Sequence, residues 1–453
     1  MKHPFRASPC AYYLRYWKRV NVDRIRFVTV AAFVVAISQS SLAAILHVNP
    51  GGTGGAFATI GSAVANAHPG DTIVVAPGTY HEDVTIGIPL SLTGAGSGQS
   101  IINAMGLPNG IYIDGFDHRG LSNVAVTGFT VENAKFEGIL VTNSSFVTIS
   151  DNEVMHNNLV LNPEGCPGLP PFETSEGEDC GEGIHFIGVE QSKVTYNTSE
   201  HNSGGILLTD ETGATDHNLI TGNLVQDNPL ACGITLASHP PAAPVLSPPG
   251  VYSNVIANNY SNHNGLQVLG AGAGVGIFAP GPGNKAYANV VVNNTLTDNG
   301  LPGVTLHNHA APTGAPPVNL NDNIIMENTI YGNAADTADA ATPGPTGINI
   351  FGIAPITGTL IFGNVINEEA IDVATKTPGQ VNVHLNSLLG GSIGVDNLGN
   401  GRVDAIENWW GSPDGPGTQG ATKVSGAGKS LISFTPWLRN PVPELPAVAT
   451  GTN

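Results

Sequence analysis

Charged residues are scarce in this chain of 453 residues: Asp, Glu, Lys and Arg together make up 11% of it, and aromatic residues only 6%. Coiled coils and ordinary helical bundles carry far more charge on their exposed faces, so this composition argues against both. Cysteine is also rare, with four in the whole chain, and the spacing fits no zinc-binding or thiol redox motif.

Long apolar runs are missing except for one, at residues 27–37. Seven basic residues precede this run of 11, and Ser41-Leu42-Ala43 follows it with small residues at the −3 and −1 positions of a cleavage site. Eleven apolar residues are too few for a convincing membrane span, so the order predicts a signal peptide over residues 1–43. We expect a secreted, periplasmic or cell-surface protein with no membrane span in the mature chain.

Positive charge is almost absent from that mature chain, which retains 9 Lys and Arg against 34 Asp and Glu, a net charge of −25. Such a surface repels nucleic acid, so we expect no nucleic-acid partner. It also repels an acidic polysaccharide unless a cation such as Ca²⁺ mediates. Solubility of an exported protein is the simpler interpretation of this charge.

Glycine (58 residues) and proline (33 residues) are abundant, which suits short strands joined by tight turns. A repeated motif, Asn-x-x-x-x-Asn, occurs near Gly-Ile dipeptides, here called Gly-Ile steps. Two of these, Gly183-Ile184 and Gly205-Ile206, are 22 residues apart. A repeat of this length with strand-like pieces and no helical period predicts the coils of a β-solenoid. The six copies of the motif begin at Asn152, Asn197, Asn223, Asn259, Asn294 and Asn328.

The first residues of the predicted mature chain have the pattern of a cap. Ile60, Val64 and Ala67 recur at helical spacing, and residues 71–84 then suggest two strands around the Pro77-Gly78 turn. A solenoid exposes an open strand edge at its first coil, and a short amphipathic helix covers it. We therefore predict an N-terminal capping helix within residues 56–70.

The phrase PGDTIVVAPGTYHEDVTI at 69–86 resembles the opening of secreted right-handed parallel β-helix proteins of the pectin-lyase-like class. Asn408-Trp409-Trp410-Gly411, followed by Asp414-Gly415-Pro416, resembles a segment near their C-terminal end. The resemblance implies an all-β fold, a single-stranded right-handed parallel β-helix. The expected order is a signal peptide (1–43), N-terminal cap and first coils (44–94), β-helix repeats with inserted loops (95–405), and C-terminal cap and tail (406–453).

The repeated asparagines have a structural interpretation in such a fold. Successive coils lie about 4.8 Å apart, so equivalent asparagines stack inside and exchange side-chain amide hydrogen bonds. This stacking argues against N-glycosylation at Asn197, although Asn197-Thr198-Ser199 is a matching sequon.

Inserted loops on both sides of the Gly-Ile strands predict a groove over one sheet, between two walls. Outward-facing positions of that sheet supply the candidates for substrate binding, where aromatic rings would stack on sugar faces. Packing of these side chains beneath the loops is the alternative interpretation. The candidates are Tyr112, Phe278, His307 and Asn349.

The corner after the Gly-Ile strands is the candidate catalytic site. Aligning three Gly-Ile steps brings carboxylates from successive coils to one corner, about 5 or 10 Å apart, the range that retaining and inverting glycosidases use. Crowded carboxylates raise one another's pKa, which supplies an acid and a base. Polar turns occur at every solenoid corner, so a purely structural role stays open. The candidates are Glu190, Asp210, Glu211, His239 and His185.

Two further motifs carry possible chemistry. The loop 164–182 holds six acidic residues, which makes Ca²⁺ the one candidate cofactor, although no ligand set is assigned; Cys166 and Cys180 flank this loop and could close it as a disulfide. Asp117-His118-Arg119 could neutralise a uronate and abstract its proton. The epimerase-type Asp-Pro-His motif and the polygalacturonase-type signature are both absent.

Two functions follow. The first is an exported monomer that binds, and as an enzyme cleaves or epimerises, a polysaccharide or cell-envelope glycan in the groove; a hydrolase or a lyase is the expected enzyme class. The second is a non-catalytic cell-surface scaffold or adhesin-like protein, favoured by the low charge and the missing family signatures. Copper handling, as in β-helix accessory proteins, is disfavoured because the chain has only four methionines.

Overall fold

The structure is a computed structural model that describes residues 43–158, 168–173, 181–239, 249–268, 270–309, 316–337 and 340–442. The predicted signal peptide, Cys166 and Cys180 lie outside the described residues. Ala43–Asn453 forms one compact unit. Among the described residues, no helix has both the length and the apolarity to cross a membrane.

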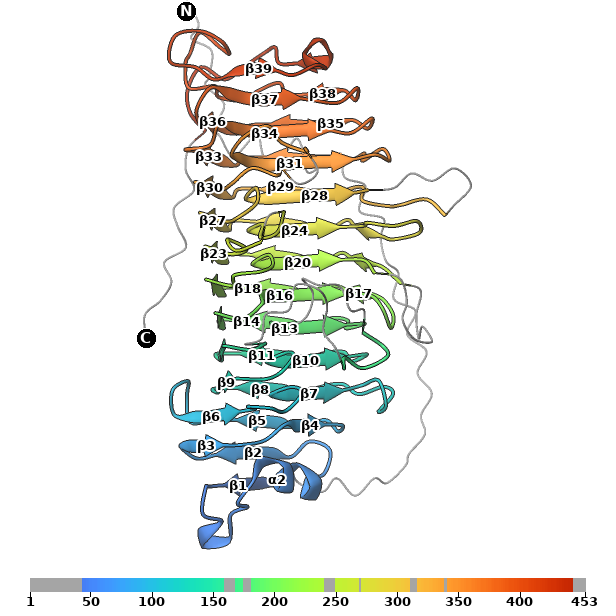
Figure 1. Cartoon of the computed structure of the whole chain (residues 1–453), viewed down its shortest axis with the longest axis vertical. Helices are drawn as coiled ribbons and strands as arrows, with labels where there is room; N and C mark the ends of the chain where they lie inside the picture. Colours follow the sequence, from blue (N-terminus) through green and yellow to red (C-terminus); the bar gives the residue numbers. More distant parts are fainter. Residues whose placement is uncertain are drawn as a thin grey trace, which may run out of the picture. The chain divides into compact units, whose positions relative to one another are not determined.

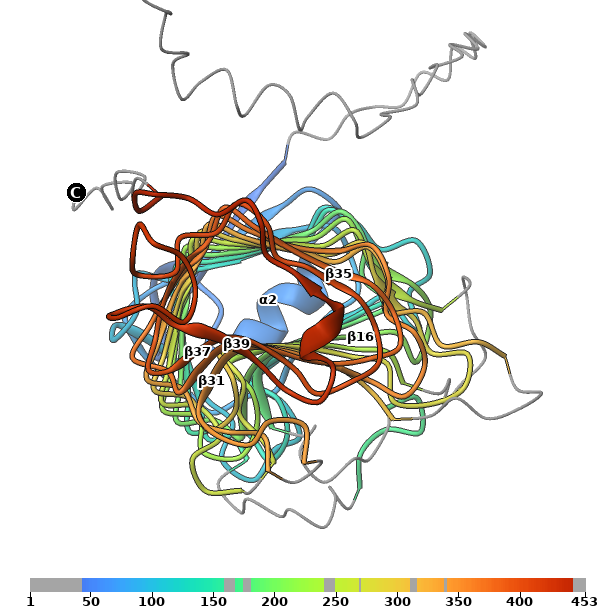
Figure 2. The ribbon, with the colours of Figure 1, turned by 90° about the horizontal axis from the view of Figure 1, so that it is seen from above.

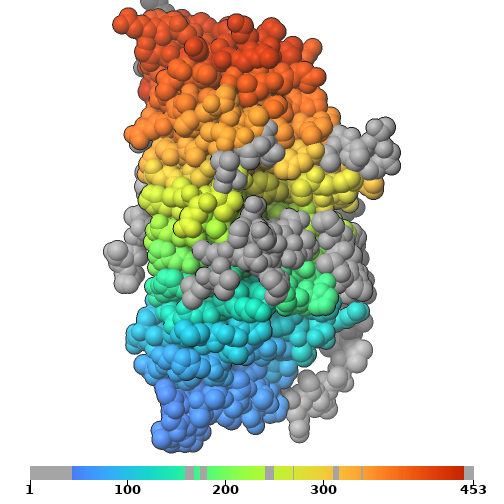
Figure 3. Space-filling view, in the orientation of Figure 1, coloured from blue at the N-terminus to red at the C-terminus, as the bar shows by residue number. Residues whose placement is uncertain are grey.

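The chain winds into coils that each add one strand to several parallel sheets (Figure 1). The coils stack in sequence order, as the succession of colours in Figure 3 shows. Every pairing between named strands is parallel, as in the register that sets Ile149 of one coil between Val126 and Val194 of its neighbours. The predicted β-solenoid is therefore confirmed as a parallel β-helix.

Sheet A has 14 strands within the described residues. In stacking order they are β1 (Ile45–Val48), β2 (Thr72–Val75), β5 (Ser91–Thr93), β8 (Ala125–Thr127), β11 (Thr148–Ser150), β14 (Lys193–Thr195), β18 (Leu219–Thr221), β22 (Val255–Ala257), β26 (Val290–Val292), β29 (Ile324–Met326), β32 (Thr359–Phe362), β35 (Val381–His384), β38 (Val403–Asp404) and β40 (Ile432–Ser433).

Sheet B has 11 strands in the same described ranges. They are β3 (Gly78–Tyr80), β6 (Ser100–Asn103), β9 (Thr130–Glu132), β12 (Glu153–Met155), β15 (Thr198–Glu200), β19 (Leu224–Gln226), β23 (Tyr260–Asn262), β27 (Thr295–Thr297), β30 (Thr329–Tyr331), β33 (Val365–Asn367) and β36 (Ser387–Leu389).

Sheet C contains the Gly-Ile strands, 12 of them in the described part of the chain, and the three-stranded sheet D borders it. Sheet C consists of β4 (Val84–Ile86), β7 (Ile111–Asp114), β10 (Ile139–Thr142), β13 (Glu182–Ile187), β16 (Gly204–Thr209), β20 (Ile234–Ala237), β24 (Val275–Phe278), β28 (Val304–Asn308), β31 (Thr346–Gly352), β34 (Ile371–Lys376), β37 (Ile393–Asn397) and β39 (Lys423–Ser425). Sheet D consists of β17 (Thr215–Asp216), β21 (Val251–Tyr252) and β25 (Ala286–Tyr287).

The core runs along the axis of the coils, and Figure 2 looks down that axis. In short strands such as β14 only the central residue, here Val194, is buried, while its neighbours face solvent. Aliphatic residues at such positions stack coil upon coil, and each fully buried one contributes about 1.5–3 kcal/mol. Glycine is required at a Gly-Ile step such as Gly205, because even a Cβ there would collide with the carbonyl oxygen of Gly233 in the next coil.

Asparagine side chains form three buried ladders between the sheets, which confirms the stacking interpretation. Each amide nitrogen donates to the amide oxygen of the next coil, as Asn223 Nδ2 does to Asn259 Oδ1 at 2.9 Å. One ladder ends at Asn408 of the Trp-Trp motif, and a second ends on the carboxylate of Glu369. The first ladder is Asn152, Asn197, Asn223, Asn259, Asn294, Asn328, Asn364, Asn386 and Asn408; the second is Asn157, Asn202, Asn228, Asn264, Asn299 and Asn333; the third is Asn218, Asn254, Asn289 and Asn323.

A short helix, α2 (Ile60–Asn66), lies across the N-terminal end of the tube, as predicted for the cap (Figure 2). Thr59 caps it by accepting from the backbone N–H of Ser62, and the Glu82 carboxylate accepts from two more free N–H groups of its first turn. Ile60 is fully buried in the core. Two 3₁₀ turns, η1 (Thr53–Gly55) and η2 (Lys429–Leu431), complete the helical segments in the described residues.

Sheet C differs from the other long sheets because its strands are buried on both faces. Every residue of β10, β13, β16 and β20 is buried, whereas strands of sheet A alternate between buried and exposed. The outer face of these strands is thus covered rather than open as the predicted groove requires. Phe172 is one covering group, packed on Leu140 and Ile187.

Candidate functional site

Asp210, Glu211, Ser238 and His239 meet at the corner after β16 and β20, where they form one buried cluster. Thr209 pairs with Ala237, so Asp210 and Glu211 lie beside Ser238 and His239 in the next coil. Asp210 accepts from the hydroxyl of Ser238 and from the backbone N–H of His239, both at 2.8 Å. His239 Nδ1 lies 3.0 Å from Glu211 Oε1.

The pKa values of the two carboxyl groups at this corner are shifted in opposite directions. Burial raises the pKa of Asp210 to about 7, although the bonds from Ser238 and His239 oppose this. Burial also raises the pKa of Glu211, but the hydrogen bond and charge of His239 outweigh it and hold that pKa at about 2. Two neighbouring carboxyls whose pKa values are pushed apart provide a proton donor beside an ionised carboxylate.

His185 joins this corner from the preceding coil. Its Nε2 lies 3.0 Å from the hydroxyl of Thr209, and its Nδ1 lies 3.2 Å from a carboxylate oxygen of Glu173. The charge of His185 also lowers the pKa of Glu211. The structure therefore brings together four of the five predicted catalytic candidates: Asp210, Glu211, His239 and His185.

Glu190, the fifth, is placed elsewhere, and the alignment that put it in the cluster needs correction. It forms a bridge with Asp216 at the edge of sheet D, not with Asp210. Its pKa is raised by partial burial and by the charge of Asp216. Glu190 comes three residues after the end of β13, whereas Asp210 follows β16 directly, so the two occupy different points of the turn.

Three of the predicted substrate-binding residues converge farther along sheet C. His307 Nε2 contacts Asn349 Nδ2 at 2.9 Å and Asp336 Oδ2 at 2.8 Å. The rings of His307 and Phe278 meet edge to face at 6.0 Å. His307 and Asn349 are buried, however, so these groups already bind one another.

Tyr112 lies apart from them on β7, five strands from Phe278 on β24, or about 24 Å at the usual strand spacing, and farther still from His307 and Asn349. Its hydroxyl donates to Asp114 at 2.9 Å, and its ring packs with Leu140 and Phe172. The interpretation in which these side chains pack under covering groups therefore describes Tyr112 better than a free stacking platform.

Three glutamates form a second buried cluster with His185. Ligand atoms of Glu137, Glu182 and His185 all lie within 4.8 Å of one another, and Glu173 contacts the same imidazole. Glu173 and Glu182 belong to the acidic loop 164–182 noted in the sequence, whereas Glu137 was not among the predicted residues. The repeated triplet Glu-Gly-Ile at 137–139 and 182–184 was the available signal, because equal triplets in consecutive coils stack.

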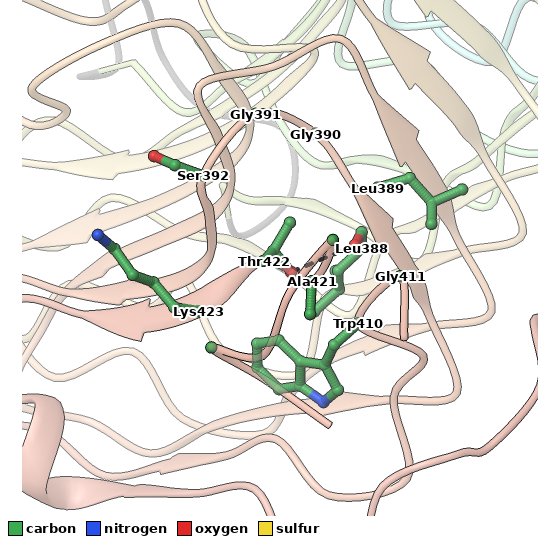
Figure 4. Close-up of a pocket in the computed structure, with 12 residues that line it drawn as sticks. Leu388, Leu389, Gly390, Gly391, Ser392, Trp410, Gly411, Ala421, Thr422 and Lys423 are labelled. Atoms are coloured by element: carbon green, nitrogen blue, oxygen red, sulfur yellow. Dashed lines mark hydrogen bonds between the residues drawn. The ribbon is translucent and has the colours of Figure 1, made fainter. Parts of the chain in front are cut away.

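The remaining motifs and pockets contain fewer groups that could act as an acid or a base. His118 of the Asp117-His118-Arg119 run contacts Asp114 at 3.2 Å, and its side chain is half exposed. A cavity of about 550 Å³ lies at the C-terminal end, lined largely by glycines and by the buried ring of Trp410 (Figure 4). Its only ionisable side chain is Lys423, so it offers no acid–base pair, and the corner is the better candidate.

Comparison with known proteins agrees with this fold. The protein-family model described as a right-handed β-helix region matches residues 97–277 of this chain. DFA-IIIase from Arthrobacter chlorophenolicus A6, without its lid, is 14% identical with a TM-score of 0.54 over 85% of this chain and 96% of that one. The A-module of Azotobacter vinelandii mannuronan C-5 epimerase AlgE6 is 16% identical with a TM-score of 0.52, covering 84% and 94%.

A third structure, the Dettilon tailspike protein gp208, is 13% identical with a TM-score of 0.50 and covers 84% of this chain and 68% of that one. No curated protein matches the sequence. At these identities the likeness concerns the fold alone. We conclude that the chain has the right-handed parallel β-helix fold, from its parallel coils, the matched segment 97–277 and the likeness to these structures.

Proposed function

We propose that this protein is exported and hydrolyses a neutral polysaccharide at the corner formed by Asp210, Glu211 and His239. The observation that carries the proposal is the pair of adjacent carboxyls with pKa values of about 7 and about 2 around one imidazole. The mannuronan C-5 epimerase among the structural neighbours supports a polysaccharide as the substrate class.

Hydrolysis needs one proton donor and one ionised carboxylate. Asp210 is protonated up to about neutral pH and gives its proton to the departing glycosidic oxygen as the bond to the anomeric carbon breaks. Glu211 stays ionised and stabilises the positive charge that develops on the sugar, while His239 holds its carboxylate in place. Water adds its hydroxide to the anomeric carbon, and its remaining proton restores Asp210.

A neutral substrate fits this corner better than a uronate. Among the described residues, the groups that lower the pKa of Asp210 and Glu211 are histidines and hydroxyl or backbone donors; no lysine or arginine is among them. Elimination from a uronate requires a cation to neutralise the sugar carboxylate. Without such a cation, the ionised carboxylate of Glu211 would repel the carboxylate of the sugar.

A non-catalytic scaffold or glycan-binding module is the second candidate, and a specific observation favours it. Asp210 and Glu211 are each 1% exposed, so a substrate reaches them only if the groups above the corner separate from it. If they stay in place, the network of Asp210, Ser238 and His239 serves to join two coils, as the asparagine ladders do.

The test uses residues 44–453 with a panel of neutral and acidic polysaccharides, and it measures new reducing ends, unsaturated-uronate absorbance and glycan binding. We expect reducing ends from a neutral glycan and their loss in Asp210→Asn and Glu211→Gln. Asp151→Asn, an exposed carboxyl-to-amide change, is the matched control. Binding that persists in all variants without turnover would instead establish the non-catalytic module, and unsaturated products would refute hydrolysis.

A further inference from the structure

His185 is the middle member of a chain of polar contacts that leads from a covering segment to the corner. Its Nδ1 lies 3.2 Å from a carboxylate oxygen of Glu173, which belongs to the segment 168–173 that covers sheet C with Phe172. Its Nε2 lies 3.0 Å from the hydroxyl oxygen of Thr209, at the end of β16. The side chain of His185 is only 1% exposed, so bulk water does not compete for either nitrogen.

The contact with Glu173 requires a hydrogen on Nδ1 of His185. Burial and the negative charge of Glu173 raise the pKa of Glu137 well above its usual value, so Glu137 is protonated at neutral pH. The hydrogen bond between these two carboxyl groups consequently runs from Glu137 to Glu173. An ionised carboxylate offers lone pairs and no hydrogen. His185 is therefore the donor in its contact with Glu173.

The contact with Thr209 requires a hydrogen on Nε2 of His185. Glu211 is ionised at neutral pH, because its hydrogen bonds with His239 and Thr209, together with the charge of His239, outweigh its burial and lower its pKa. Thr209 has one hydroxyl hydrogen, and hydrogen bonds to charged acceptors are about twice as strong as those between neutral groups. The hydroxyl hydrogen therefore points to Glu211, and the hydroxyl oxygen accepts from His185.

The charges around His185 favour its protonated form. In the described part of the chain, no lysine or arginine is among the groups that shift the pKa of Glu137 or Glu211. Burial disfavours a charged imidazole, whereas neighbouring negative charges favour it, and Glu173 and Glu211 are both ionised. The carboxyl groups near the ring come from four elements: Glu137 from the turn before β10, Glu173 from the segment 168–173, Glu182 from β13 and Glu211 from the turn after β16.

A neutral imidazole has a single N–H and can donate in one direction only. We propose that His185 is a buried imidazolium ion that donates to Glu173 and to Thr209, and that Glu173 is a positioning residue for the corner. The charge of Glu173 keeps the imidazole protonated, and the imidazole with Thr209 keeps Glu211 ionised. The effect on hydrolysis rests on the function proposed above, whereas the charge of His185 does not.

Replacing Glu173 by glutamine removes the anion on one side of the ring. His185 then loses its proton at a lower pH, and Thr209 turns its hydrogen toward Nε2. Glu211 loses a hydrogen bond and a neighbouring positive charge, both of which lower its pKa in the unaltered protein. The pKa of Glu211 therefore rises in this variant.

The first test measures the charge of His185 by NMR in residues 44–453 with isotope-labelled histidine, since Ala43–Asn453 is a compact unit. The imidazole nitrogen shifts distinguish the imidazolium ion from each neutral tautomer, and the signals that are missing in His185→Gln identify this residue. We expect an imidazolium ion at pH 7. Glu173→Gln should lower the midpoint of its titration by about 1–3 pH units, whereas the exposed change Asp151→Asn should not shift it.

A second variant removes the contact on the other side of the ring. Thr209→Val keeps the shape of the side chain but removes the oxygen that accepts from Nε2, so it should also lower the midpoint while the segment 168–173 is unaltered. Circular dichroism establishes that each variant is folded, and the spectrum of the unaltered protein depends on no variant. A neutral His185 at pH 7 in the unaltered protein overturns the proposal, as do midpoints that are the same in both variants as in the control.

The positioning role is tested by the titration of the Glu211 carboxyl, followed by NMR in glutamate-labelled protein. Glu173→Gln should move this titration to higher pH, and an unmoved titration overturns the positioning role. The fall in kcat for hydrolysis at low pH should begin at a higher pH in the same variant, with KM unchanged. If the unaltered protein hydrolyses no glycan, the proposed function fails, whereas the two titrations still decide this inference.

Discussion

Replacing Asn294 tests the asparagine ladder at its middle. This side chain is 1% exposed. Its Oδ1 accepts from the backbone N and from Nδ2 of Asn259, at 2.9 and 3.0 Å. Its Nδ2 donates to Oδ1 of Asn328 at 3.0 Å and to the carbonyl of Ile256 at 2.9 Å. One residue therefore connects three consecutive coils.

Alanine at this position removes these four bonds and a fifth, from Nδ2 to the carbonyl oxygen of Val292 at 3.1 Å. Asn259 Nδ2 keeps a second acceptor in the carbonyl of Ile220, and Asn328 Oδ1 still accepts from the backbone N–H of residue 294, but the buried N–H of Asn259 loses its side-chain acceptor. An orphaned buried donor costs about 1–3 kcal/mol and each further lost bond about 0.5–1.5 kcal/mol. We expect Asn294→Ala to lower the free energy of unfolding by about 3–5 kcal/mol.

Asn294→Asp should be worse at neutral pH, because it sets a carboxylate oxygen against the oxygens of Asn328 and Ile256. The pKa of this aspartate is raised in the folded state above its unfolded value of about 3.9. Its penalty is therefore smallest below pH 3.9 and grows as the pH rises through the folded pKa.

Urea unfolding followed by circular dichroism at pH 3.5 and pH 7 measures both variants, with Asn400→Ala, a change at an exposed loop residue, as the control. Hydrogen exchange would show whether the loss is confined to the coils around β27. The reasoning is refuted if Asn294→Ala lies within about 0.5 kcal/mol of the control, or if Asn294→Asp is as stable as Asn294→Ala at pH 7.

Three other predictions follow from single residues. Hydrolysis should decline as the pH rises through about 7, because Asp210 loses the proton that it donates; a rate that keeps rising above pH 8 would contradict this role. Burial raises the pKa of Glu369 to about 7, so wild-type stability falls between pH 4.5 and 7, and Glu369→Gln should remove that fall in denaturation curves. Gly183→Ala should lower the Tm sharply, since its Cβ would collide with the Ser199 hydroxyl, whereas Gly51→Ala should not.

The prediction of the fold succeeded because its signals are local and repeated. A β-helix repeats the same turn in each coil, so an asparagine recurs in the sequence at each of these turns. The residue before many ladder asparagines has a positive φ, as Asn258 and Asn293 do, and this local requirement is also visible in the composition of the turns. The capping helix likewise followed from the spacing of Ile60 and Val64.

The site was harder to predict because the sequence does not fix the pairing register between neighbouring strands of sheet C. Gly276-Ile277 has the letters of a Gly-Ile step and would be aligned as one from the sequence, but the structure pairs Val275 with Ile234, so Gly274 occupies the glycine position. Phe278 consequently lies in the same row as His307, not as Asn349. A shift of two residues keeps every side chain on the same face of a strand, so the hydrophobic pattern cannot detect it.

The parallel coils, the asparagine ladders, the cap and the corner where Asp210, Glu211 and His239 meet could be predicted from the sequence, because short repeats and adjacent coils fix these features. The three-dimensional packing was needed to show that the outer face of sheet C is covered, that Glu190 pairs with Asp216 of sheet D, and that Glu137 lies beside Glu182 and Glu173 around His185. Burial depends on which distant segments pack over a surface. The pKa values of the buried carboxyl groups follow from that burial.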